Sequence, residues 1–124
     1  MALNKVEDVE IDADGVFKYI LIEIKEIDKK SKQEVGRKKI VRGFSWAEYH
    51  SDIMDRVAPH FTELGLQYEC VGGGRIKHSQ SNKTLHVYGY SVSFGQAKHQ
   101  LTLELLKKKY NYPEENFTCS NAGY

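Results

Sequence analysis

The segment FKYILIEI, residues Phe17 to Ile24, carries the clearest structural signal in this chain. Its apolar and β-branched residues predict a β-strand, and because polar residues are few, the strand is expected to be buried. The polar run that follows, Asp28 to Lys39, predicts a solvated loop, and Ile40 to Arg42 predicts a short strand after it. The fold is therefore expected to be built around a β-sheet.

Two helices are predicted from apolar residues that recur every three or four positions. The first is expected to begin at Ser45, which forms a capping-box pattern with Glu48, and to run toward Leu64. Pro59 predicts a kink or a break in this helix, because proline lacks the N–H that a helix interior needs. The second helix is expected from Gln96 to about Tyr110.

Further strands are predicted between and after the helices. They are Leu66–Val71, Arg75–His78, Thr84–Tyr90 and a short segment near Phe117. Gly65 is expected to end the first helix, and the glycines Gly72 to Gly74 predict a sharp change of chain direction. Residues 1–124 are thus predicted to form one small α/β domain, in which a sheet of about six strands packs against two main helices.

Composition excludes several functional classes. The net charge is +1, so there is no overall attraction to nucleic acid or to an anionic membrane. No segment approaches the roughly 20 apolar residues of a membrane span, and the first residues lack the apolar core of a signal peptide. Cys70 and Cys119 are lone thiols without metal-ligand spacing. These features predict a cytoplasmic, reduced protein with no metal, no cofactor, and no nucleic-acid or membrane partner.

Two short motifs resemble phosphatase signatures but fail on physical grounds. The stretch DADGV at Asp12–Val16 has the spelling of a two-aspartate phosphatase, yet the residues before it alternate with acids and do not form a buried strand. The stretch CVGGGR has one residue too few between Cys70 and Arg75 for a loop that encircles a phosphate. Cys70 is therefore interpreted as a small apolar residue in a strand.

His50 is the residue that needs explanation. In the predicted first helix it shares a side with Trp46, Ile53 and Val57, so one interpretation is a core histidine with both ring nitrogens hydrogen-bonded. The other interpretation places it at the rim of a cleft, because it lies near the helix start. A helix N-terminus disfavours the imidazolium by roughly 0.3–1 kcal/mol, which keeps the ring neutral, as a nucleophile or base must be.

An anion site is predicted near the start of the second helix. The small residues of SVSFG, Ser91 to Gly95, let backbone N–H groups point at a ligand, and the serine hydroxyls can add donors. The alternative is an ordinary strand-to-helix turn. Three cations on predicted strands, Lys18, Arg42 and Arg75, complete a set that would suit a phosphoryl group.

Several longer stretches resemble the phosphohistidine phosphatase family, which includes the Janus proteins of insects. They are DADGVFKYILI, IVRGFSWAEYHSDI, ECVGGGRI, LHVYGYSVSFGQAKH and the terminal NAGY. The resemblance covers most of the chain from Val9 onward, and it implies a small α/β fold with a mixed sheet and two helices. It also implies removal of phosphoryl groups from phosphohistidine-containing proteins without a metal.

The resemblance also implies roles for individual residues. His50 matches the catalytic histidine, and Lys18, Arg42, Arg75 and Ser91 match residues that bind or surround the phosphate. Backbone N–H groups are expected from Val92, Ser93 and Phe94. Tyr49 is expected to support His50 or to contact substrate, and His99 either approaches the site or faces solvent.

Three functional hypotheses remain open at this point. His50 can attack phosphorus directly, or it can activate water as a general base. A second hypothesis is a non-catalytic phosphopeptide-binding or regulatory module of the Janus type, and a third makes His50 a purely structural residue. The sequence has no exposed heptad pattern that would predict a dimer, so a monomer is expected.

Overall fold

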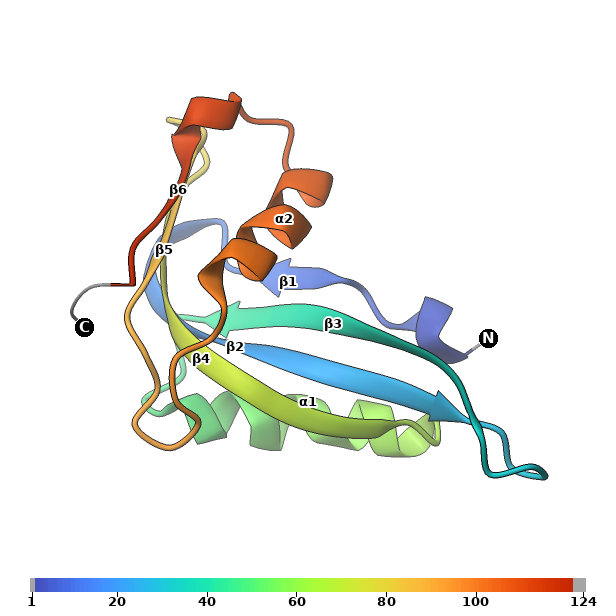
Figure 1. The fold of residues 1–124 in the computed structure, drawn as a ribbon. Coiled ribbons are helices and arrows are strands. Elements are labelled where there is room, and N and C mark those ends of the chain that lie inside the picture. Colours follow the sequence, from blue (N-terminus) through green and yellow to red (C-terminus); the bar gives the residue numbers. More distant parts are fainter. Residues whose placement is uncertain (1, 122–124) are drawn as a thin grey trace.

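The computed structural model describes residues 2–121, which form a six-stranded sheet with one helix on each face (Figure 1). The strands are β1 Val9–Ile11, β2 Asp14–Ile27, β3 Glu34–Phe44, β4 Gln67–Ser79, β5 Thr84–Tyr88 and β6 Phe117–Cys119. The helices are α1 His50–Glu63 and α2 His99–Lys109, with short 3-10 helices η1 Ala2–Lys5 and η2 Glu114–Asn116. The predicted small α/β domain with about six strands and two helices is confirmed.

Strand β2 is the centre of the sheet, whose spatial order is β1-β3-β2-β4-β5-β6. It pairs antiparallel with β3 and β4, and β4 pairs antiparallel with β5. The two outer pairs, β1 with β3 and β5 with β6, are parallel, so the sheet is mixed. The burial predicted for Phe17–Ile24 follows from this central position, because helices cover both faces of the strand.

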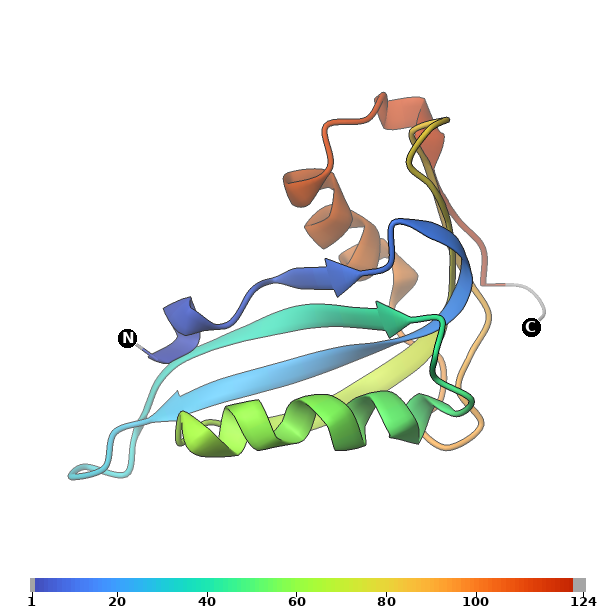
Figure 2. The ribbon, with the colours of Figure 1, turned by 180° about the vertical axis from the view of Figure 1, so that it is seen from behind.

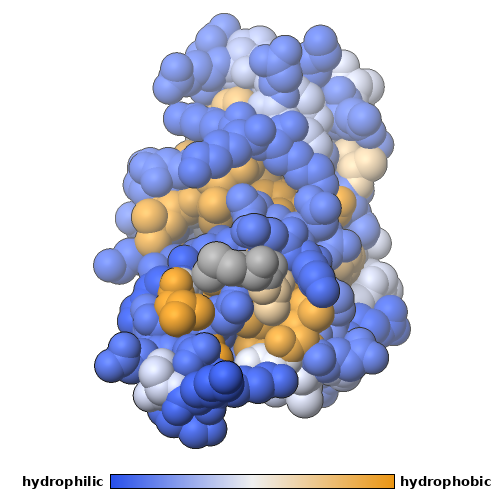
Figure 3. Space-filling model, turned by 90° about the vertical axis from the view of Figure 1, so that its right-hand side faces the viewer, coloured by the Kyte–Doolittle hydropathy of each residue, from blue (hydrophilic) through white to orange (hydrophobic). Residues whose placement is uncertain are grey.

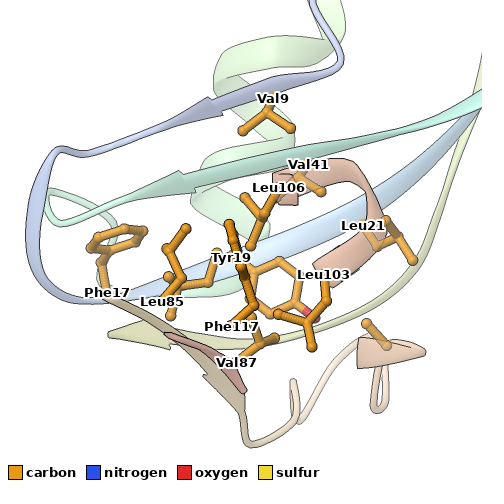
Figure 4. Close-up of a cluster of buried hydrophobic side chains, with 12 residues drawn as sticks. Val9, Phe17, Tyr19, Leu21, Val41, Leu85, Val87, Leu103, Leu106 and Phe117 are labelled. Atoms are coloured by element: carbon orange, nitrogen blue, oxygen red, sulfur yellow. The ribbon is translucent and has the colours of Figure 1, made fainter. Parts of the chain in front are cut away.

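Alternate residues of β2 enter two separate cores, as the two-residue period of a strand requires. Phe17, Tyr19 and Leu21 point toward α2, where they pack with side chains of β5, α2 and β6 (Figure 4). Ile20 and Ile22 point the opposite way and pack under α1, which lies along the sheet in Figure 2. The α1 core also contains Ile24, Ile40, Ile53, Phe61 and Leu66.

The predicted loop Asp28–Lys39 is wrong in its second half. Glu34–Lys39 belongs to β3 and pairs with β2 in a long hairpin, so that only a short turn after Ile27 is irregular. Its side chains are polar because this end of the sheet extends past α2. Arg37 and Lys39 both approach Glu23 on the neighbouring strand. Cross-strand ion pairs therefore replace the apolar alternation on which the prediction relied.

The predicted helix start at Ser45 is also wrong. Helix α1 begins at His50, and its cap is a bond from the Tyr49 N–H to the Asp52 carboxylate (2.8 Å). The Ser45 N–H instead donates to Asp12 (2.7 Å), and Trp46 stacks on Phe44 with 5.3 Å between ring centroids. These two contacts hold the segment before α1 in a non-helical path.

The end of α1 was predicted correctly, whereas the break predicted in its middle is absent. The helix is continuous through Pro59, so the predicted break is wrong. Gly65 ends the helix as predicted, with a left-handed φ of 72° that a residue without Cβ adopts readily. The Leu66 N–H then closes the end by donating to the Phe61 carbonyl (2.9 Å), as in a Schellman motif.

The change of chain direction predicted at Gly72–Gly74 is wrong, because β4 continues through these glycines without a break. The pairing of β2 with β4 shifts by one residue beside Gly72, so the glycines accompany a β-bulge. Helix α2 starts at His99 rather than Gln96, because Gln96 and Ala97 pair with Gly73 first. No helix within residues 2–121 is long and apolar enough to cross a bilayer.

Candidate functional site

A cleft of about 380 Å³ lies where the start of α1 meets β2 and the segment after β5. Its lining residues are Lys18, Glu48, Tyr49, His50, Ser91, Val92 and Ser93. Apart from His50, six residues line the cleft, and five of them are site residues predicted from the sequence. The sixth, Glu48, was predicted only to be a capping partner of Ser45. Residues that are far apart in the chain therefore meet around His50.

His50 is the first residue of α1, and its side chain is only 5% exposed. Its Nε2 lies 2.9 Å from the carbonyl oxygen of Gly74, so Nε2 carries the proton and donates it to that carbonyl. The neutral ring then has its lone pair on Nδ1, which forms no hydrogen bond with any residue in 2–121. His50 lines the cleft, so its ring brings to the site an acceptor nitrogen that no described residue occupies.

The surroundings of His50 favour the neutral ring. Burial lowers the pKa of His50 below its ordinary value of 6.5, and the positive charges of Lys18 and Arg75 lower it further. The hydrogen bond to Gly74 raises the pKa; its effect is smaller than that of burial and larger than that of either cation alone. The N-terminus of α1 adds its own positive potential. Near neutral pH the imidazole is therefore available as a base or a nucleophile.

The glycines of β4 allow these close contacts. A Cβ on Gly73 would lie 2.8 Å from His50 Cδ2 and 3.2 Å from the Cβ of Ser91. A Cβ on Gly74 would lie 2.4 Å from the Tyr88 carbonyl oxygen, on the opposite face of the sheet. Only glycine lets the histidine and the Ser91 segment approach the strand this closely.

The segment Ser91–Gly95 is a compact loop held against β4. Ser91 and Gly95 exchange backbone hydrogen bonds of 3.0 and 2.8 Å, and the Gly73 N–H also donates to the Gly95 carbonyl (3.0 Å). The buried Ser91 hydroxyl accepts the Phe94 N–H at 3.1 Å, so this amide is not available to a ligand, although the Ser91 hydroxyl can still donate its own hydrogen. The N–H groups of Val92 and Ser93 make no hydrogen bond within residues 2–121 and lie at the cleft.

Two of the three expected cations lie near His50. Lys18 on β2 and Arg75 on β4 are directly paired across the strands, on the same face of the sheet as His50. Lys18 lines the cleft, and both residues line an adjoining hollow of about 160 Å³. An anion in the cleft would therefore meet positive charge and free amides together.

Arg42 is not brought to the cleft. Its guanidinium is buried and donates to the carbonyls of Val41 (2.9 Å) and Glu7 (2.8 Å), with Glu10 at 3.1 Å. These partners tie the N-terminal segment to β3. The strand predicted for Arg42 is confirmed, but no sequence pattern indicated that its guanidinium would turn toward the N-terminal segment.

His99 lies on the other side of the sheet, buried beneath α2. Its Nε2 donates to the Gly89 carbonyl (2.9 Å), and its Nδ1 accepts from the Tyr19 hydroxyl (2.6 Å). Tyr19 also bonds the Thr102 hydroxyl at 3.0 Å, and burial raises the pKa of Tyr19, which keeps it protonated. His99 thus neither lines the cleft nor faces solvent; it anchors Gly89, two residues before the Ser91–Gly95 loop.

Other candidate sites carry less chemistry. A groove of about 420 Å³ between the N-terminal segment and α2 is lined mainly by lysines and acidic residues. Figure 3 views the molecule from the side on which the N-terminus lies in Figure 1, and there hydrophobic side chains lie between rows of hydrophilic ones. Burial raises the pKa of the Cys70 thiol, which agrees with its reading as a packed strand residue. Among residues 2–121, no three His, Cys, Asp or Glu side chains gather as metal ligands would.

Comparison with known proteins gives the family. The sequence matches the Janus/Ocnus family over residues 3–114. The chain belongs to the Janus/Ocnus family. It is 45% identical to the Homo sapiens 14 kDa phosphohistidine phosphatase over 122 residues, which is 98% of this chain and 96% of the human protein.

Other Janus/Ocnus relatives agree with this assignment. The Sus scrofa 14 kDa phosphohistidine phosphatase is 43% identical and is covered over 95% of its length. The sex-regulated protein janus-A of Drosophila yakuba is also 43% identical, with 99% of this chain and 85% of that protein covered. The family resemblance carried by the WAEYH, GGGRI and SVSFG stretches is thereby confirmed. Of the terminal NAGY stretch, residues 122–124 lie outside the described residues.

Proposed function

We propose that this chain is a protein phosphohistidine phosphatase that hydrolyses the P–N bond without a metal, with His50 as its catalytic residue. One observation carries the proposal: the His50 ring is neutral, donates from Nε2 to Gly74, and offers Nδ1 to a cleft that also contains a cation and free amides. The relatives named 14 kDa phosphohistidine phosphatase support the substrate class.

The phosphoryl group would bind between the loop and β2. The N–H groups of Val92 and Ser93 would donate to its oxygens, and Lys18 and Arg75 would neutralise their charge. Ser91 would act by holding the Phe94 amide, which shapes the loop. Phosphoryl transfer needs mainly positioning and charge stabilisation, so such a cradle supplies what the reaction requires.

His50 has two chemical routes, and both start from the Nδ1 lone pair. In the first, Nδ1 attacks phosphorus, the P–N bonding pair returns to the substrate ring, and water later releases phosphate from phospho-His50. In that intermediate His50 bears phosphorus on Nδ1 and a proton on Nε2, and the Gly74 carbonyl stabilises the resulting cation. In the second route, Nδ1 removes a proton from a water molecule that attacks phosphorus.

The decisive measurement is phosphate release from a phosphohistidine peptide in the presence of EDTA. Wild-type protein should release phosphate, and His50→Ala should lose release by at least about a hundredfold, as removal of a general acid–base group does. His60→Ala, an exposed histidine on the same helix, serves as the matched control and should retain release. Tight peptide binding without release by wild type would instead identify a phosphopeptide-binding module.

The remaining parts of the proposal concern the whole molecule. Residues 1–124 would act as one monomeric domain in the cytoplasm, with phosphohistidine-containing proteins as partners and with neither nucleic acid nor membrane as a ligand. The net charge of +1 supports the last point. Acid-quenched protein from a turnover reaction, tested for phosphoryl on His50, separates the two routes: labelled His50 supports direct attack.

A further inference from the structure

Glu48 is out of place in a cleft that would bind a phosphoryl group. It lines the same cleft as His50, yet its carboxylate would repel the phosphoryl oxygens. Its side chain is exposed and forms neither a hydrogen bond nor an ion pair with residues 2–121. The Glu48 carboxylate is therefore available to a positively charged group that arrives with the substrate.

Tyr49 follows Glu48 in the chain and lines the same cleft, and most of its ring is exposed to solvent. It is 62% exposed, although a tyrosine ring gains free energy when it is covered. Val92, from the Ser91–Gly95 loop, also lines the cleft and is 85% exposed. Within one cleft, then, the residues before α1 offer a carboxylate and an aromatic ring, and the loop offers an apolar side chain. A planar cation is the group that fits this combination, through charge and through cation–π contact.

We propose that Glu48 and Tyr49 form a leaving-group subsite that binds the protonated imidazole ring of the substrate phosphohistidine. This inference rests on the proposed function and deepens it, because it assigns the second half of the substrate to a place in the cleft. The volume of about 380 Å³ falls at the lower end of ligand pockets, roughly 300–1,000 Å³, and exceeds the need of a phosphoryl group alone.

The chemistry of P–N cleavage explains why such a subsite would matter. When the P–N bond breaks, its electron pair returns to the ring nitrogen that carried phosphorus. A ring already protonated on its other nitrogen leaves as neutral imidazole, whereas an unprotonated ring would have to leave as an anion. Glu48 favours the protonated ring and therefore the better leaving group, whichever route His50 takes.

The subsite also selects the class of substrate. Phosphorylated nitrogen bases such as phosphohistidine and phospholysine can carry positive charge on the leaving group. Phosphate esters of serine, threonine and tyrosine cannot, so they would meet the Glu48 carboxylate without compensation. The other charges near the bound ring are Lys18 on β2 and Arg75 on β4, which face the phosphoryl end.

The test compares Glu48→Gln with wild type on two ligands. We expect kcat/KM for a phosphohistidine peptide to fall about tenfold, as loss of one charge contact in a partly desolvated site predicts. Inorganic phosphate fills the cradle but has no leaving group, so its inhibition constant should stay the same or decrease. Asp55→Asn, which removes an exposed carboxylate further along α1, is the matched control and should change neither quantity.

The pH profile supplies a readout that a structural role would not change. Glu48 raises the pKa of the bound substrate ring, so its removal should move the alkaline limb of kcat to lower pH by about one unit for a tenfold effect. An equal loss of affinity for phosphate and peptide, or an unchanged profile, overturns the subsite. If wild type itself releases no phosphate, the proposed function fails instead, and the two failures are distinguishable.

Discussion

Gly73→Ala tests whether the close packing on β4 controls the position of His50. The new Cβ would lie 2.8 Å from His50 Cδ2 and 2.8 Å from the Tyr19 carbonyl oxygen, about 0.6 Å short of the 3.4 Å at which ordinary contact begins. Tyr19 belongs to the central strand β2 and can yield little, because both neighbouring strands hold it. The His50 ring and the Ser91 loop must therefore move.

The size of the effect follows from this overlap. Overpacking a close-packed site costs about 1–3 kcal/mol of unfolding free energy. A misplacement of a catalytic group by about 1 Å can cost a factor of about 100 in rate. Because the overlap here is somewhat smaller, we expect kcat for a phosphohistidine peptide to fall between about tenfold and a hundredfold, with a loss of stability in the range above.

Gly65→Ala is the matched control, measured by the same phosphate-release assay and by urea unfolding. Gly65 has a left-handed φ of 72° and open space around it, so alanine there costs about 1–2 kcal/mol through backbone strain alone. It ends α1 at the far end from His50, so kcat should not change. Wild-type kcat in Gly73→Ala, or an equal loss in both variants, would refute the reasoning.

Two further predictions concern buried histidines. Burial and neighbouring cations lower the pKa of His50, and in the proposed mechanism the neutral ring is the active form. The acid limb of kcat/KM should therefore lie below pH 6.5, and an acid limb above that value would contradict the assignment. Tyr19→Phe removes the hydroxyl shared by His99 and Thr102, so urea unfolding should show a loss of about 1–3 kcal/mol. Adding Thr102→Val should restore only part of that loss, because it removes the stranded Thr102 hydroxyl but leaves His99 Nδ1 without its donor.

Sequence patterns predicted an element correctly where neighbouring residues in the chain determine its structure. The buried strand around Phe17–Ile24, the helix end at Gly65 and the short strand near Phe117 were all predicted correctly. The start of the first helix was not, because Ser45 bonds to Asp12 and Trp46 stacks on Phe44. Both partners come from the sheet, and no pattern within the helix segment could reveal them.

The candidate site shows the same division. His50, Lys18 and the SVSFG loop were recognised from residue types and from the family resemblance, and the structure places them around one cleft. Arg42 was expected there too, but its guanidinium binds the N-terminal segment instead. Glu48 was overlooked as a site residue, because its capping pattern with Ser45 offered a sufficient local explanation.

Sequence patterns were enough to predict the class of fold, the family and which histidine lies at the centre of the candidate site. These depend on periodicity, on turn residues and on specific motifs, which are properties of neighbouring positions. The three-dimensional arrangement was needed to show that Nε2 of His50 bonds to Gly74, that His50 lines the cleft, and that His99 lies on the opposite face of the sheet. Those facts depend on the position of β4 in the sheet, between α1 on one face and α2 on the other. Strand pairing brings together residues that are far apart in the chain, and no local sequence pattern shows which of them will meet.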